Sequence, residues 1–99
     1  MRMTTKNILC ISDEFQKIKS QVKQQHINEL FSPKGGEHYV SLVETMGTDK
    51  RVVGFVIAEH RVGRGLRYNG YSLLTHNVCF RKSIDVALKF VKAEFKNNQ

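Results

Sequence analysis

The sequence contains no tryptophan, a single proline and only two cysteines among its 99 residues. Cys10 and Cys79 lie far apart along the chain, and each belongs to an apolar run, so we interpret them as buried thiols that form no disulfide. Among the four histidines and the two cysteines, only His76 and Cys79 fall at the two-to-five-residue spacing of metal ligands, so a metal site would need the fold to bring scattered residues together. The pattern therefore predicts neither a metal site nor a cofactor.

Long hydrophobic runs are also missing. No stretch approaches the roughly 18 apolar residues of a membrane-spanning helix, and no long apolar segment follows the N-terminal Met-Arg-Met-Thr-Thr-Lys as in a secretory signal. We therefore expect a cytoplasmic protein without a membrane partner. With 40% hydrophobic and 25% charged residues, the composition is that of one globular domain spanning 1–99, with frayed ends at 1–6 and 96–99.

Acidic residues are scarce, and their distribution is uneven. The chain contains nine Asp and Glu residues and 16 Lys and Arg residues, which gives a net charge of +7. Residues 1–50 contain seven basic and six acidic residues, whereas residues 51–99 contain nine basic and only three acidic ones. Such an asymmetry indicates an anionic partner, of which nucleic acid is the commonest, although a charge that only maintains solubility would look the same. The charge distribution does not distinguish RNA from DNA as the partner.

The first third of the chain is predicted to contain an optional strand and a helix. The apolar run 8–11 is short and could be a strand, and Ser12 is an N-cap candidate for a helix that begins at about Asp13. The apolar positions of 15–22 lie on one stripe, but those of 27–31 are rotated from it. We therefore expect a bend or break near 23–26, and a helix end at the Pro33 turn.

Three strands are expected next. Residues 38–46 favour a strand, 47–50 a turn, and 51–62 a second strand whose centre is the most apolar part of the protein. Residues 63–65 form another turn signal, and 66–74 can form a third strand. Asn69 and Gly70 leave open whether this strand is continuous or contains a hairpin tip.

The closing helix has two apolar sides. Ser83 is its N-cap candidate, and the main stripe at helical spacing consists of Ile84, Ala87, Leu88, Val91 and Phe95. The second apolar side consists of Val86, Phe90 and Ala93. This second side could be an interface with a protein partner or the seam of a homodimer.

The predicted fold class is α+β, in the order (β)-α-β-β-β-α, with an antiparallel three-stranded sheet packed against two helices. With Arg81-Lys82 just before the last helix, this order over about 13–96 resembles a double-stranded-RNA-binding domain, which implies duplex RNA as a partner. The segment 66–71 is similar to a strand of bacterial mRNA-interferase toxins. Both resemblances are of layout or of a short segment, and no family residues are carried over.

Two constellations could contact phosphates. Arg61, Arg64 and Arg67 are spaced by three around a glycine-rich turn, and Tyr68 and Tyr71 could stack on bases. A basic ridge on the last helix consists of Lys82, Lys89, Lys92 and Lys96, with Arg81 at its start. The segment Lys34-Gly35-Gly36 is too short for a phosphate loop and is interpreted as a turn.

These features favour a non-enzymatic nucleic-acid-binding domain in which phosphate contacts dominate. The alternative is a protein-interaction module that regulates or inhibits a nucleic-acid-handling enzyme and is dimeric through the last helix. A small ribonuclease, with His60 or His76 as the acid/base, ranks third because no catalytic motif surrounds a serine or cysteine.

Overall fold

The structure is a computed structural model that describes residues 2–32, 38–61 and 63–98. Its elements, in chain order, are β1 (Met3–Leu9), α1 (Asp13–Lys19), α2 (Gln24–Leu30), β2 (Tyr39–Thr45), β3 (Val52–Arg61), β4 (Gly65–Ser72), β5 (Val78–Arg81) and α3 (Ile84–Asn97). The class is α+β as expected. The prediction of three strands and two helices is wrong, because the described chain has a five-stranded antiparallel sheet and three helices.

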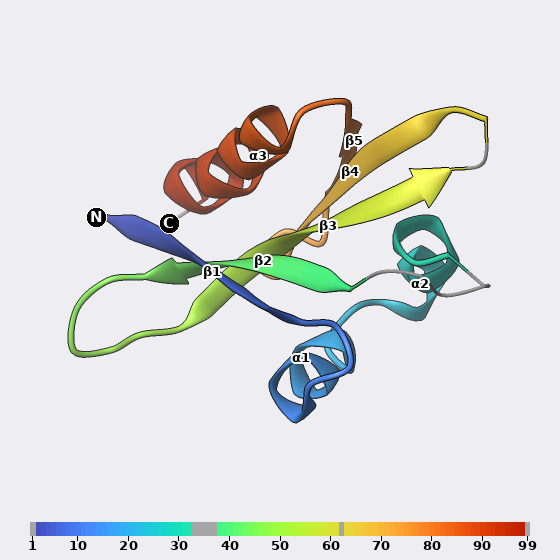
Figure 1. The fold of residues 1–99 in the computed structure, drawn as a ribbon. Helices are drawn as coiled ribbons and strands as arrows, with labels where there is room; N and C mark the ends of the chain where they lie inside the picture. The colour runs from blue at the N-terminus through green and yellow to red at the C-terminus, as the bar shows by residue number, and fades with distance from the viewer. Residues whose placement is uncertain (1, 33–37, 62, 99) are drawn as a thin grey trace.

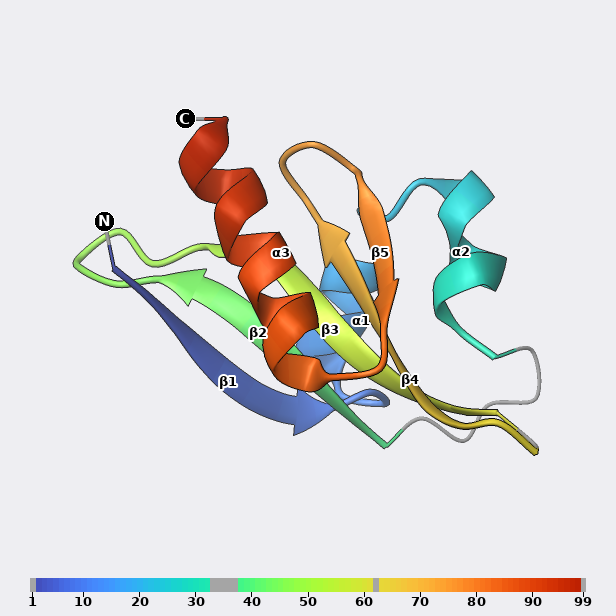
Figure 2. The ribbon, with the colours of Figure 1, turned by 90° about the horizontal axis from the view of Figure 1, so that it is seen from above.

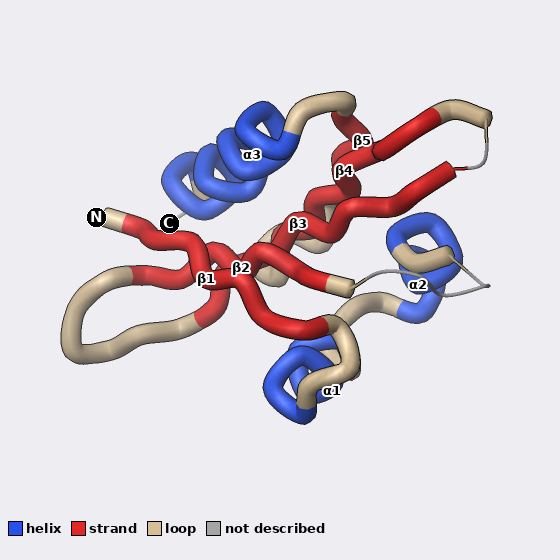
Figure 3. The backbone as a smooth tube through the Cα atoms, viewed as in Figure 1, coloured by secondary structure: helices blue, strands red, loops and turns tan. Residues whose placement is uncertain are grey.

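The sheet has the strand order β1-β2-β3-β4-β5, so every strand pairs with its neighbours in the sequence. Figure 1 shows α3 on one side of this sheet and α1 and α2 on the other, and Figure 3 shows the same three layers by element type. Both short helices lie in the connection between β1 and β2. We refer below to the α3 side and the α1–α2 side of the sheet.

Alternation along the central strands fills a core on each side. Phe55 and Ile57 of β3 belong to the α1–α2 core, whereas Val56 between them belongs to the α3 core. Val53 also belongs to the α3 core, because the register with β2 shifts by one residue there, where Val43 pairs with Gly54 but Glu44 pairs with Val52. Because both faces of β3 are covered, the strand reads as a nearly continuous apolar run. This explains why residues 52–58 are the most apolar part of the sequence.

The sequence pattern did not fully predict the two edge strands, β1 and β5. β1 includes residues 3–6, which we expected to be frayed, and pairs with β2 from Met3–Thr45 to Leu9–Tyr39. β5 has only four residues and pairs with β4 between Tyr68–Arg81 and Tyr71–Val78. Edge strands bury little, so their hydrophobic pattern is weak and their pairing depends on the neighbouring strand. At the other end, α3 continues to Asn97.

The predicted break in the first helix is confirmed. α1 ends at Lys19 and α2 begins at Gln24, so the break falls slightly earlier than expected. The Ser12 hydroxyl caps α1 by accepting a hydrogen bond from the Phe15 N–H at 3.2 Å. Ser83 occupies the N-cap position of α3, although its side chain forms no capping hydrogen bond. The expected turn at 33–36 lies outside the described residues.

β4 is continuous through Asn69 and Gly70, which excludes a hairpin tip there. The Asn69 side-chain amide is fully buried and donates to the Leu30 carbonyl at 3.0 Å, which ties α2 to the strand. A Cβ atom at Gly70 would lie 2.8 Å from the Cys79 sulfur, so glycine is required by the close approach of β5. The extra strands also separate this fold from the double-stranded-RNA-binding layout.

The two cysteines lie in different cores. Cys10 packs against the α1–α2 core, whereas Cys79 is buried in the α3 core, so the sheet stands between them. Burial raises the pKa of the Cys79 thiol above its ordinary value, because the thiolate would lose its hydration. No helix in the described part of the chain is long and apolar enough to cross a membrane.

Candidate functional site

The β3–β4 hairpin projects beyond the rest of the sheet and begins the candidate site (Figure 1). The register ends at the Arg61–Gly65 pair, and the Arg64 N–H donates to the Arg61 carbonyl at 3.0 Å. Gly63 and Gly65 have φ values of 75° and 78°, in the left-handed region that glycine adopts without strain. The two glycines thus form a tight turn that presents Arg64 at its exposed tip.

β5 and the turn after it bring a second group of cations beside this hairpin. The Tyr68–Arg81 pair ends the β4–β5 ladder, so Arg81 and Lys82 lie next to the first residues of β4. A cavity of about 650 Å³ lies between the two groups. We call it the basic cleft, and its lining residues are Arg61, Arg64, Leu66, Arg67, Phe80, Arg81 and Lys82.

Four of the five cations of the basic cleft have no carboxylate partner among the described residues. Arg64, Arg81 and Lys82 are exposed and Arg61 is half-buried, and none of them takes part in the ion pairs of the described chain. The described lining also contains no acidic residue. The cleft therefore concentrates unneutralised positive charge in a concave surface, which attracts anions.

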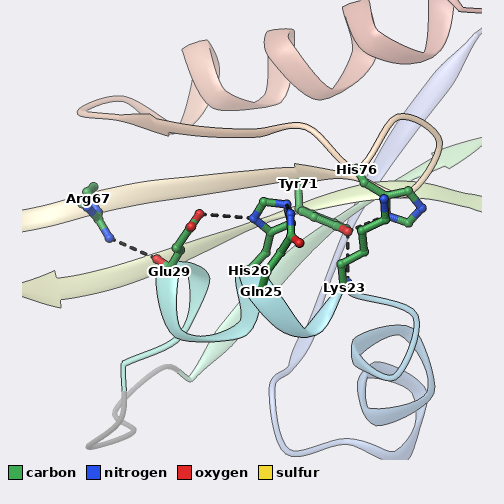
Figure 4. Close-up of polar contacts among 7 residues, drawn as sticks. All are labelled: Lys23, Gln25, His26, Glu29, Arg67, Tyr71 and His76. Atoms are coloured by element: carbon green, nitrogen blue, oxygen red, sulfur yellow. Dashed lines mark hydrogen bonds and ion pairs between the residues drawn. The ribbon is translucent and has the colours of Figure 1, made fainter.

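Arg67 is the exception, because its guanidinium is paired with a carboxylate. It lies 4.4 Å from the centre of the Phe80 ring and 2.9 Å from a carboxylate oxygen of Glu59. It also donates to the backbone carbonyl of Glu29 at 3.2 Å (Figure 4), which links β4 to α2. The Arg67 and Glu59 side chains are only 27% and 12% exposed. Arg67 thus forms part of the wall of the cleft. This differs from the expectation that Arg67 would lie at an exposed turn.

In comparisons with known proteins, the chain matches no family model, no curated protein and no solved structure.

Of the two tyrosines that we expected to stack on bases, only Tyr68 is not fully buried. Tyr68 is half-buried at the margin of the α3 core. Tyr71 is fully buried in the α1–α2 core, where its ring packs 5.7 Å from that of Phe55. Its ring is therefore not available to a ligand.

The Tyr71 hydroxyl is the centre of a polar cluster that ties the α1–α2 segment to β4 (Figure 4). It accepts a hydrogen bond from the Lys23 N–H at 3.2 Å and is also hydrogen-bonded to Nδ1 of His76. The His26 ring lies 5.8 Å from the Tyr71 ring and contacts the Glu29 carboxylate at 3.2 Å. These partners give the cluster a structural role that sequence reasoning missed.

The histidines considered as acid/base groups do not come together. His76 lies in the β4–β5 turn, where its φ of 62° makes it the single non-glycine residue with positive φ in the described chain. His60 lies on β3 and pairs with Leu66, at the opposite end of β4. Among the described residues there is also no cluster of three or more His, Cys, Asp or Glu side chains that could hold a metal.

The basic ridge expected on the last helix is only partly joined to the cleft. Arg81 and Lys82 line the cleft, but Lys89 and Lys92 do not, because α3 carries them away from the hairpin. Lys89 is exposed and Lys92 is half-buried. The structure thus joins Arg81 and Lys82, the start of one predicted constellation, to the three arginines of the other.

The second apolar side of α3 faces outwards. Val86 is 46% exposed and Ala93 is exposed, whereas Phe90 is half-buried beneath the Arg81 guanidinium, which lies 6.0 Å from its ring centre. Ile84 adds a further partly exposed side chain at 37%. An apolar strip therefore remains on this helix in the described chain.

Proposed function

We propose that this protein is a non-enzymatic nucleic-acid-binding domain that holds phosphates in the basic cleft. The observation that supports this most strongly is the convergence of Arg61, Arg64, Arg81 and Lys82 around one cavity whose described lining has no acidic residue. Nucleic acid is the anion best suited to such a surface, because its phosphates are regularly spaced and each one can be neutralised separately.

The backbone of the cleft also suits a phosphate chain. Beyond the Tyr68–Arg81 pair, residues 65–67 of β4 have no described strand beside them on the β5 side. Their free edge can donate backbone N–H groups, and arginine guanidinium groups can bind phosphate oxygens in pairs. Side chains and backbone can thus contact successive phosphates together.

The proposal is non-enzymatic because the basic cleft lacks the side chains that most often perform acid/base chemistry. Its described lining residues include neither a histidine nor a carboxylate. Histidine and carboxylate side chains are the usual general acids and bases, and they must lie within hydrogen-bond reach of the reacting atoms. We expect labelled RNA to remain intact after incubation with the protein, and cleavage that disappears in a His76→Ala variant would replace binding with a ribonuclease function.

The proposal is tested by titrating labelled single-stranded and duplex RNA and DNA with the protein at about 50 mM and 200 mM salt. We expect measurable binding at the lower salt concentration and clear weakening at the higher one, since each phosphate contact releases counterions. The absence of binding to all four ligands at low salt would overturn the proposal.

A second candidate, favoured by the exposed Val86 and Ala93 on α3, is a protein-interaction module that regulates or inhibits a nucleic-acid-handling enzyme. An exposed apolar strip on a helix is a common contact surface for a protein partner or a second copy of the chain. This function and nucleic-acid binding would use different surfaces. They are therefore separable by variants on α3 and in the basic cleft.

A further inference from the structure

A row of side chains crosses the whole sheet on the α3 side, beside the basic cleft. Leu9 pairs with Tyr39, Ala58 pairs with Tyr68, and Tyr68 pairs with Arg81. Tyr39 itself lies beside Ala58, one step beyond the Val40–Ile57 pair. The row therefore consists of Leu9, Tyr39, Ala58, Tyr68 and Arg81, one residue from each strand.

All members of this row point to the α3 side. Tyr39, Ala58 and Arg81 each lie an even number of residues from a side chain of the α3 core, since Val43, Val56 and Cys79 belong to that core. Tyr68 packs partly against the same core. Cross-strand partners share a face, so Leu9 points to the same side as Tyr39.

The helix α3 leaves much of this row open. Figure 2 views the molecule from the α3 side and shows that the helix lies over the middle of the sheet, while β1 and the β3–β4 hairpin extend beyond it. Tyr39 is 63% exposed and Leu9 is 47% exposed. Neighbouring strands lie about 4.8 Å apart, so the two tyrosines, two strands apart, are separated by roughly 10 Å. Such a spacing gives each ring room for its own base.

The row also continues into the basic cleft. Arg81 is its last member and lines the cleft, and Leu66, which is 50% exposed, also lines it. Arg81 therefore belongs both to the row that contains the two tyrosines and to the basic cleft. A duplex buries its base faces within the stack, whereas a single strand can place its phosphates on cations and its bases on aromatic rings at the same time.

Resting on the proposed function, we infer that its ligand is a single-stranded nucleic acid, with bases stacked on Tyr39 and Tyr68 and phosphates in the basic cleft. Tyr39 is the best residue for the test, because its exposed ring can be removed without opening the core. Replacing Tyr39 with phenylalanine keeps the stacking face and removes only the hydroxyl. Met46→Ala is the matched control, since Met46 is also an exposed apolar side chain at 49% but lies at the other end of β2.

The experiment measures the affinity of the wild type and these three variants for a labelled 12-nucleotide RNA, the same DNA sequence, and the duplex of each. We expect the wild type to prefer single strands. Tyr39→Ala should weaken single-strand binding by roughly 5- to 150-fold, as expected when one base no longer stacks, and leave duplex binding and the salt dependence unchanged. Tyr39→Phe and Met46→Ala should bind as the wild type does. The RNA and DNA arms identify which single strand is the better ligand.

The possible failures are distinct. Single-strand binding that is unaffected by Tyr39→Ala, an equal weakening for Met46→Ala, or a wild-type preference for duplex would overturn the stacking surface and leave nucleic-acid binding in place. No binding of the wild type to any of the four ligands would overturn the proposed function and this inference with it. Unchanged circular dichroism spectra would show that the variants are folded.

Discussion

Gly54 lies in the middle of β3, where the strand is approached closely from two sides. A Cβ atom at this position would lie 2.4 Å from the Tyr71 carbonyl oxygen and 2.4 Å from a methyl group of Val91. The carbonyl belongs to the neighbouring strand and cannot rotate away. The glycine that interrupts the most apolar run of the sequence is therefore a packing requirement.

We predict that Gly54→Ala lowers the free energy of unfolding by about 3 kcal/mol, at the upper end of the usual range for overpacking. Urea denaturation monitored by circular dichroism measures the change. Gly63→Ala is the control, because no atom lies within 4 Å of its added Cβ and only its positive φ of 75° opposes alanine. It should cost only about 1 kcal/mol. Equal destabilisation by both variants would show that β3 and α3 are not packed as described.

Arg67 and Arg64 are three residues apart but have different roles. Replacing Arg67 with glutamine leaves the nearly buried Glu59 carboxylate without its cation, so we predict a decrease of about 1 to 3 kcal/mol in stability. Arg64→Gln at the exposed tip should change stability by less than about 0.5 kcal/mol. Thermal melting of the two variants compares them directly. An unchanged melting temperature for Arg67→Gln would mean that the Glu59 contact contributes nothing.

In α3, fewer residues are buried than the helical spacing of its apolar residues predicted. The sequence pattern assigned five residues to its buried stripe, but Ala87, Val91 and Phe95 are buried, Leu88 is only half-buried and Ile84 is 37% exposed. A helix on the surface of a sheet covers it with a narrower stripe than a helix surrounded by other elements.

We predict that Val91→Ala costs about 2 to 3 kcal/mol, because Val91 is fully buried between α3 and the central strands. Leu88→Ala removes more atoms but should cost only about 1 kcal/mol, since its side chain is already partly in water. Chemical denaturation of the two variants gives the order. A larger destabilisation by Leu88→Ala would require the helix to be rotated about its axis.

The elements that the sequence predicted are those with strong local signals. Apolar periodicity and turn residues were sufficient for the helix break before Gln24, for the hairpin at 63–65 and for the closing helix. β5 was missed because its four residues are too few to show a periodicity. The length of β1 was underestimated because Met3 and Ile8 are its only partly buried residues, so the strand has little hydrophobic pattern. Both strands are defined by hydrogen bonds to a neighbour, which a local pattern does not encode.

The site of the whole molecule could be predicted only in parts, because the sequence pattern did not predict β5. The sequence indicated the arginines of the hairpin and the Arg81-Lys82 pair as separate constellations. Only the pairing of β5 with β4 makes them the two sides of one cleft. Tyr39 gave no signal, because Tyr68, the other tyrosine of its row, is 29 positions away in the chain.

The oligomeric state tests the second candidate function. If the apolar strip of α3 forms a dimer seam, Val86→Glu should convert a dimer into a folded monomer, because an unpaired carboxylate in a dry interface is strongly unfavourable. Val86 is 46% exposed, so the same change should leave the monomer fold intact. Gel filtration with light scattering measures the mass. A monomeric wild type would remove the dimer from consideration.

The salt dependence of nucleic-acid binding shows whether the basic cleft binds phosphates. Each phosphate that the protein neutralises adds roughly 0.9 to the slope of log K against log salt on duplex DNA, and about 0.7 on single strands. The test variant replaces Arg61, Arg64 and Lys82 with glutamine and keeps the structural Arg67. The control variant makes the same change in net charge elsewhere, at the exposed Lys17, Lys50 and Lys96.

We predict that the cleft variant flattens the slope by about 2 units on a single strand, whereas the control variant keeps a slope close to that of the wild type. Both variants should melt within a few degrees of the wild type, because none of the six side chains has a carboxylate partner among the described residues. Equal slopes for the cleft variant and the wild type would show that the phosphate-binding residues lie outside the cleft.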